Sequence, residues 1–257
     1  MIQLHNIHKS FGDHNVLQDV SAVFERGKVN FVIGRSGSGK SVMTKCTVGL
    51  IEPDQGFVSY DGRDFTAMKK RERGMIRQEI GMLFQGSALF DSMSVKDNVQ
   101  FPLQMFSKLS KAEIEKRASA CLERVELEDA GSRFPSECSG GMQKRVGIAR
   151  AIAMNPKYLF CDEPNSGLDP QTAIVIDNLI KDITVEYQMT TVVVSHDMNS
   201  VMEASDTIHF VHNGRICWKG DRQQLLRGGN QELEDFVFAS DLMRQVRMHG
   251  NHKGDES

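Results

Sequence analysis

The sequence predicts an α/β fold in which helices flank a doubly wound, mostly parallel sheet. Two observations support this fold class. Short apolar strands alternate with amphipathic helices along most of the chain, and a glycine-rich loop stands between one such strand and the next helix. A third observation adds an insertion, because residues 86–155 are richer in helix patterns than in strand patterns. We therefore expect a sheet-based lobe interrupted by a helical one.

The first part of the chain contains short strands and turns. Residues 16–24 alternate apolar and polar side chains, which predicts a strand after a turn at residues 11–13. Residues 31–33 form an apolar strand that runs into the glycine-rich loop, and residues 42–50 suit a buried helix. Residues 57–60, followed by Asp-Gly, predict another strand and its turn.

The middle of the chain carries signals for helix starts. Ser110 and Glu113 form a capping-box pattern, and the apolar residues behind them recur at helical spacing. A second helix is expected to begin near Ser139. These two helices make up much of the predicted insertion.

The C-terminal part returns to alternating strands and helices. Residues 158–161 are a continuous apolar strand, and the β-branched residues 190–194 predict a central strand. Between them, Asp169 followed by Pro170 is typical of an N-cap and the first helical position. Residues 231–247 suit a C-terminal amphipathic helix.

Composition excludes several classes of protein. The 257 residues carry 31 basic and 34 acidic side chains, so the net charge of −3 provides no overall positive field for nucleic acid. The five cysteines lack metal-ligand spacing, which favours a reduced, cytosolic chain. No apolar run approaches about 18 residues, so no membrane span is expected. We expect one domain over residues 1–248 and a mobile polar tail over residues 249–257.

Residues 34–41, Gly-Arg-Ser-Gly-Ser-Gly-Lys-Ser, match the phosphate-binding pattern GxxxxGK[ST] between a strand and a helix. The glycines allow backbone N–H groups to converge on phosphate oxygens, and the helix N-terminus favours negative charge. Lys40 is expected to reach the β and γ phosphates, and the Ser41 hydroxyl to bind Mg²⁺. The alternative is a glycine-rich turn whose lysine faces water.

Adjacent carboxylates follow the apolar strand at residues 158–161. Asp162 and Glu163 reach the C-terminal edge of the sheet, where α/β folds bind ligands. Strand alternation predicts that the two side chains point apart, so we expect Asp162 to hold Mg²⁺ and Glu163 to orient or deprotonate a water. The alternative is an exposed strand end with solvated acids.

Further motifs extend the pattern over nearly the whole chain: Ser-Gly-Gly at residues 139–141, Gln85, Ser-Gly-Leu-Asp at residues 166–169, and His196. With these motifs, the sequence resembles the ATP-binding subunits of ABC transporters. Ser139-Gly140-Gly141 resembles the core of the family's signature sequence, and Gln85 its Q-loop glutamine. Residues 166–169 resemble the D-loop, and His196 the switch histidine. Singly each motif is weak, but their order and spacing match the family.

The resemblance implies a P-loop NTPase of ABC type: a mixed central sheet with flanking helices, an N-terminal antiparallel β subdomain and an inserted helical subdomain. It also implies ATP and Mg²⁺ as cofactors and a head-to-tail dimer with two composite sites. The implied catalytic residues are Glu163, His196, Gln85 and Lys40, and the implied metal ligands are Ser41, Gln85 and Asp162. The implied nucleotide-binding residues are Phe11, Gly34, Arg35, Ser36, Gly37, Ser38, Gly39, Lys40, Ser41, Val42, Ser139, Gly140, Gly141 and Asp169.

Some of these residues have a purely structural alternative or depart from the family pattern. Phe11 stands where tyrosine is common; it keeps a face for adenine but is also an ordinary turn residue. Gln85 could be a surface amide, and His196 a structural histidine. In the signature, Cys138 replaces leucine and Met142 replaces glutamine, while the serine and both glycines remain.

Residues 84–103 resemble ATPases of Mla-type lipid-transport systems, which act with Mce-domain proteins in phospholipid traffic. The implied partners are membrane permease subunits, with Mce-type and small accessory subunits, at the cytoplasmic face of a bacterial inner membrane. Other ABC importers or exporters of small molecules share much of this stretch and remain an alternative. Two further rivals are a soluble ABC protein of DNA repair or translation and a P-loop kinase.

Overall fold

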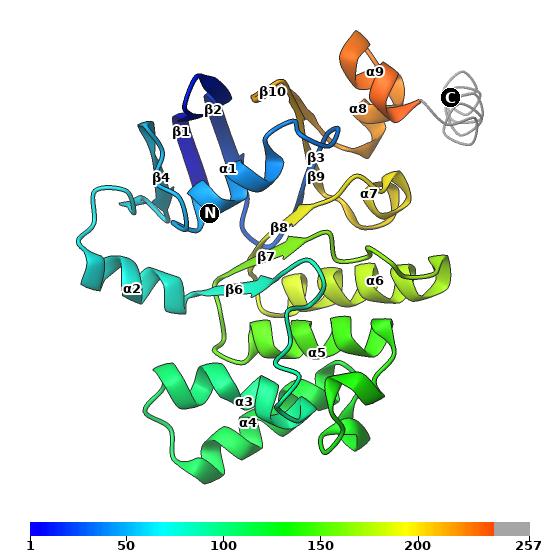
Figure 1. The fold of residues 1–257 in the computed structure, drawn as a ribbon. Helices are drawn as coiled ribbons and strands as arrows, with labels where there is room; N and C mark the ends of the chain where they lie inside the picture. Colours follow the sequence, from blue (N-terminus) through cyan, green and yellow to red (C-terminus); the bar gives the residue numbers. More distant parts are fainter. Residues whose placement is uncertain (239–257) are drawn as a thin grey trace.

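The computed structural model describes residues 1–238, which form two sheets and flanking helices (Figure 1). The four-stranded antiparallel sheet has the order β2-β1-β4-β5. Its strands are β1 (Ile2–Phe11), β2 (His14–Phe24), β4 (Gln55–Tyr60) and the short β5 (Arg63–Asp64). The predicted strands at residues 16–24 and 57–60 lie in β2 and β4.

The six-stranded sheet has the order β10-β9-β3-β8-β7-β6. Its strands are β3 (Val29–Ile33), β6 (Ile80–Leu83), β7 (Tyr158–Asp162), β8 (Thr190–Val194), β9 (Thr207–His212) and β10 (Arg215–Gly220). All neighbouring pairs are parallel except β9 with β10. Every residue of β3 and of β8 is buried, as expected for parallel strands covered on both faces. The α/β prediction with a mixed sheet is confirmed.

Helices flank the two sheets. They are α1 (Lys40–Thr47), α2 (Lys70–Gln78), α5 (Gly140–Ile152), α6 (Pro170–Glu186), α7 (Met198–Ala204), α8 (Arg222–Arg227) and α9 (Gln231–Val237). Of these, α5, α6 and α7 lie in the connections between strands of the six-stranded sheet, and α8 and α9 follow its last strand, β10. The Asp169 carboxylate caps α6 by accepting from the backbone N–H groups of Gln171 and Thr172. Of the expected C-terminal helix, residues 231–237 are helical, and the rest lies outside the described residues, as does the expected tail.

Two further helices, α3 (Val95–Phe106) and α4 (Lys111–Arg124), follow β6 in the chain. Figure 1 places them at the end of the molecule opposite the antiparallel sheet, with α5 between them and the six-stranded sheet. The expected capping box is present, since the Ser110 hydroxyl accepts from Glu113 N–H and Glu113 Oε2 accepts from Ser110 N–H at 2.7 Å. Within the described residues, no helix combines the length and apolar character needed to cross a membrane.

A buried histidine on β9 makes stability depend on pH. His209 is 1% exposed, with its ring edge-on to Phe24 at 5.0 Å between centroids. Burial lowers the pKa of His209 to about 4, and the nearby Lys219 charge acts in the same direction. In the unfolded chain, His209 binds a proton below about pH 6.5. In the folded protein it does so only when the pH falls to about 4, so lowering the pH between these values favours unfolding.

We expect this histidine to cost the folded protein about 3 kcal/mol between pH 7 and pH 4. Urea unfolding at both pH values measures the loss. His209→Gln cannot titrate, so its loss is expected to be smaller by that amount. An equal loss in both proteins would show that His209 titrates normally.

Candidate functional site

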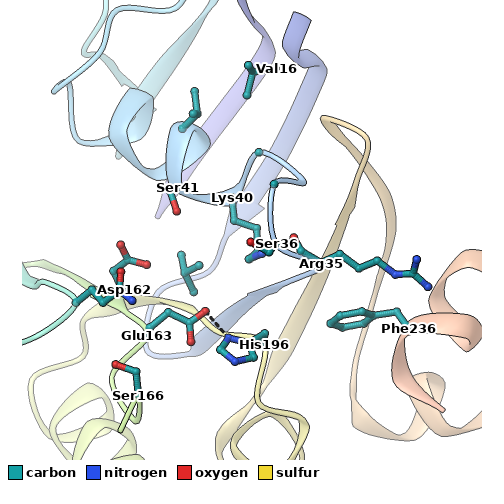
Figure 2. A pocket seen from close by; sticks show the side chains of 15 residues that line it. Val16, Arg35, Ser36, Lys40, Ser41, Asp162, Glu163, Ser166, His196 and Phe236 are labelled. Atoms are coloured by element: carbon teal, nitrogen blue, oxygen red, sulfur yellow. Dashed lines mark hydrogen bonds and ion pairs between the residues drawn. The ribbon is translucent and has the colours of Figure 1, made fainter. Parts of the chain in front are cut away.

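A cleft of about 640 Å³ opens where the strands of the six-stranded sheet end, a size common for small-molecule sites (Figure 2). It brings together the glycine-rich loop and the turns that follow β6, β7 and β8. Its lining residues are Val16, Arg35, Ser36, Gly37, Gly39, Lys40, Ser41, Val42, Gln85, Asp162, Glu163, Ser166, Val194, His196 and Phe236.

Lys40 is the cation at the centre of the loop. It is 8% exposed, and its Nζ donates to the carbonyl oxygens of Gly34 at 2.8 Å and Arg35 at 2.9 Å. Burial lowers the pKa of Lys40, and the carboxylates of Glu163 and Asp162 oppose that shift. Two carbonyl oxygens of the loop therefore hold a largely buried ammonium in place, where a bound anion would compensate for its lost hydration.

The loop conformation depends on glycine. Gly34 has φ +150°, and a Cβ there would lie 2.2 Å from the carbonyl oxygen of Val211. Gly37 has φ +78° with open space around it, so glycine is needed there for its backbone conformation. Ser38 Oγ is buried without a hydrogen-bond partner among the described residues. A loop with an unpaired buried hydroxyl and a buried ammonium fits a phosphate group.

Asp162 and Glu163 both line the cleft, contrary to the expectation that they point apart. Alternation ends because β7 ends at Asp162 and Glu163 adopts φ +49°, in the left-handed region. The Glu163 N–H is held by the carbonyl oxygen of Val194 at 2.9 Å. Burial, followed by the charge of Glu163, raises the pKa of Asp162, and Lys45, Lys40 and Lys144 oppose this shift.

Glu163 and His196 are in direct contact. Glu163 Oε1 lies 2.8 Å from His196 Nδ1, and their side chains are 16% and 69% exposed, respectively (Figure 2). The histidine thus reaches the solvent side of the cleft while orienting a mostly buried carboxylate. Such a pair can hold a water between a proton acceptor and a group that stabilises negative charge.

Three oxygen-bearing side chains meet the requirements of Mg²⁺. Ser41, Gln85 and Asp162 line the same cleft, and hydroxyl, amide and carboxylate oxygens are hard ligands. Among the described residues, no group of three or more His, Cys, Asp or Glu side chains is arranged to hold a metal. A hydroxyl, an amide and one carboxylate oxygen leave coordination positions for water and phosphate oxygens, which Mg²⁺ commonly takes.

Seven predicted binding residues are not among the residues that line the cleft. Gly34 and Ser38 belong to the loop, with Gly34 supplying a carbonyl oxygen to Lys40. Phe11 is 50% exposed, and the Lys9 ammonium lies 5.5 Å from the centre of its ring. The others are Ser139, Gly140, Gly141 and Asp169, at the starts of α5 and α6.

The start of α5 is fixed by a side-chain cap and by close packing against α6. Ser139 caps the helix, its Oγ accepting from Met142 N–H at 3.2 Å, and both Ser139 and Gly140 are exposed. A Cβ at Gly141 would lie 2.5 Å from Thr172 Cγ2, so this glycine also permits the close approach of α6. The sequence pattern indicated the exposed N-terminus but not this packing constraint.

Four lining residues were not predicted: Val16, Ser166, Val194 and Phe236. Ser166 lies in the Ser-Gly-Leu-Asp segment, where only Asp169 had been selected. Phe236 comes from α9 and lines the same cleft as Arg35 (Figure 2). No local motif marks Phe236, because only the packing of α9 brings it to the cleft.

Comparison with known proteins gives a consistent result. The family model described as "ABC transporter" matches residues 17–166. The methionine import ATP-binding protein MetN of Desulfitobacterium hafniense is 37% identical over 98% of this chain and 77% of that protein. The probable ribonucleotide transport ATP-binding protein mkl of Mycobacterium tuberculosis is 36% identical over 92% of this chain, which spans 66% of that protein's length.

Solved structures agree with the fold. The dimeric post-hydrolysis state of an ATP-binding cassette bound to ADP and Pi has a TM-score of 0.78 and 33% identity, covering 86% of this chain and 98% of that one. The structure of cbiO1 from Clostridium perfringens, part of the ABC transporter complex cbiONQ, has a TM-score of 0.83 and 26% identity. It covers 96% of this chain and 98% of that one.

Proposed function

The chain belongs to the ABC transporter family, and from this premise we propose that it closes as a head-to-tail dimer on two Mg-ATP molecules to energise a separate membrane permease. It is an ATPase subunit that uses ATP and Mg²⁺. The observation that carries the proposal is the cleft in which Lys40, Asp162 and the Glu163–His196 pair converge.

Each side chain of the cleft has a distinct role in the proposed mechanism. Lys40 and the loop N–H groups hold the β and γ phosphates, and Glu163 accepts a proton from the attacking water. His196 keeps Glu163 oriented and stabilises charge on the transferred phosphoryl group. Ser41, Gln85 and Asp162 would hold Mg²⁺, which would supply positive charge to neutralise the nucleotide phosphates.

The second phosphate-binding surface is the start of α5. Ser139 and Gly140 expose the first turn of a 13-residue helix, which favours an anion through its N–H groups and dipole. Because this turn lies outside the cleft of its own chain, we assign it to the ATP of a second copy. Asp169 and Phe11 are proposed to join the closed site as the family resemblance implies.

An apolar groove beside the cleft is proposed to receive the permease at the cytoplasmic face of a bacterial inner membrane. It has a volume of about 290 Å³ and lies between β6, α3 and the C-terminal end of α5. Phe84, Phe90 and Phe106 line it and are 40–56% exposed. Because Gln85 follows Phe84 directly, a permease seated there would act on the nucleotide cleft.

The cargo proposal has two candidates. Phospholipid transport with Mce-type and accessory subunits rests on the resemblance of residues 84–103 to Mla-type ATPases. Import of a small molecule is the second candidate, because MetN is named for methionine import. Both use the same ATPase and differ in the permease.

Purification of the tagged full chain from detergent-solubilised membranes distinguishes these candidates. We expect a permease to co-purify, and ATPase activity of the reconstituted complex to rise with phospholipid. A rise only with amino acids such as methionine would replace the lipid assignment with the second candidate. Recovery with nucleic acid and without a permease would overturn the transport proposal. Phe106→Glu tests the docking groove: a charge in the apolar groove is expected to abolish co-purification of the permease, while the variant still binds ATP.

A further inference from the structure

A buried polar cluster lies behind the cleft, outside the residues assigned above. Asp177 of α6 is 2% exposed, Asn165 of the turn after β7 is 9% exposed, and Ser200 of α7 is 2% exposed. Asn165 Nδ2 donates to Asp177 Oδ1 and to Ser200 Oγ, both at 2.8 Å. One amide thus joins three segments that are separate in the sequence.

Two of these segments carry the reactive pair of the cleft. Asn165 lies two residues after Glu163, whose carbonyl oxygen accepts from Ser166 N–H at 3.2 Å to close the turn. Because Glu163 has φ +49°, surrounding contacts must hold this backbone conformation.

Ser200 secures the other segment, which begins at His196. The Ser200 hydroxyl donates to Asp197 Oδ2 at 3.3 Å, and Asp197 caps α7 directly after His196. Helix α6 packs against α7 and supplies the carboxylate on which the amide is anchored.

We propose that Asp177 is a positioning residue for ATP hydrolysis, because through Asn165 and Ser200 it anchors the two loops whose side chains meet at the Glu163–His196 contact. The inference rests on the proposed function. Asp177 acts through Glu163 and His196 and does not line the cleft itself. Its loss should therefore misplace the reacting groups while leaving the phosphate loop unchanged.

The charge of Asp177 opposes folding. Burial raises the pKa of Asp177 to about 6, the neighbouring Ser200 and Asn165 oppose that shift, and the charges of Asp197 and Glu203 raise the pKa further. Near pH 8 the carboxylate is ionised and carries the cost of burial. Leucine at this position removes the charge at a similar side-chain volume, so Asp177→Leu is expected not to lower the melting temperature at pH 8. The melting temperature therefore reports the stability of the variant, and kcat reports the positioning of Glu163 and His196.

The first test compares steady-state ATPase kinetics of the full chain and its Asp177→Leu variant, whose side chain has a similar size but cannot accept from Asn165 Nδ2. We expect kcat to fall by about tenfold to a hundredfold with KM for ATP unchanged, because small displacements of reacting groups slow chemistry more than binding. Asp182→Leu, an exposed change on the same helix, is the matched control and should keep the wild-type kcat. An unchanged kcat in Asp177→Leu would overturn the proposal, as would a raised KM with normal kcat.

The second test exchanges donor and acceptor. Asn165→Asp places two carboxylates together and should lower kcat further, whereas the double variant Asn165→Asp/Asp177→Asn restores a donor–acceptor pair and should regain most of it. Failure of the double variant to exceed Asn165→Asp, with both proteins folded, contradicts the inference. If Asn165→Asp does not fold, Ser200→Ala takes its place and should lower kcat at constant KM; a wild-type kcat in Ser200→Ala would then count against the proposal.

These results remain distinguishable from failure of the proposed function. If the wild-type chain shows no ATP hydrolysis, with or without its permease, the proposed function itself fails. If Glu163→Gln abolishes hydrolysis while Asp177→Leu retains wild-type kcat, only the positioning role is lost.

Discussion

Glu163→Gln is expected to slow ATP hydrolysis by about 10²–10⁴-fold while leaving ATP bound. Glutamine has the shape of glutamate and can still contact His196, but it cannot accept a proton from water. Since ATP closes the proposed dimer and hydrolysis opens it, the variant should accumulate as a long-lived dimer. Single-turnover hydrolysis and sedimentation of the full chain with Mg-ATP measure the two effects.

A matched control separates this effect from a general loss of charge. Glu123→Gln changes an exposed carboxylate on α4 and should keep wild-type turnover. Turnover near the wild-type rate in Glu163→Gln itself would remove Glu163 from the role of base. Slowed hydrolysis without accumulation of the dimer would argue against hydrolysis as the step that opens the dimer.

Lys40→Ala is expected to weaken ATP binding by about tenfold to a hundredfold, the range for losing a hydrogen bond from a charged group. The ammonium is buried and held by two carbonyl oxygens, so water cannot replace it in the same geometry. Equilibrium titration with Mg-ATP measures the change. Lys116→Ala, an exposed change on α4, serves as the control. Unchanged affinity would exclude Lys40 from the phosphate site.

The same lysine tests the composite sites. In a mixed dimer, one copy carries Lys40→Ala and the other Ser139→Arg, so both lesions fall in one head-to-tail site and the other site stays intact. Homodimers of either variant have two damaged sites and should bind ATP weakly or fail to close. Recovery of ATP-dependent dimerisation on mixing is the expected result. If mixing restores nothing, Ser139 does not complete the partner's site.

The sequence predicted the sheet and the loop well because their signals are local. Residues 34–41 match their pattern within eight consecutive positions, and β3 and β8 are wholly buried, as their apolar composition indicates. The order of strands in the sheet could not be predicted from local patterns, because β3 pairs with β8 and β9, which lie far away in the chain.

Site geometry was predictable only in part. Alternation along β7 suggested that Asp162 and Glu163 point apart, yet a left-handed residue at Glu163 places both in one cleft. The family resemblance selected His196, but its 2.8 Å contact with Glu163 joins residues 33 positions apart. Phe236 carried no motif and reaches the cleft only through the packing of α9.

The sequence by itself determined the chemistry of this protein: an α/β fold with a phosphate loop, a strand ending in carboxylates and a glycine-flanked helix start. Each of these features is set by residue types only a few positions apart, and such short segments adopt their local conformation largely from backbone geometry. The tertiary structure decided which side chains meet, including the Glu163–His196 pair and the amide that joins Asp177 to Ser200. Those contacts depend on how separate strands and helices pack, and close packing is a property of the whole core.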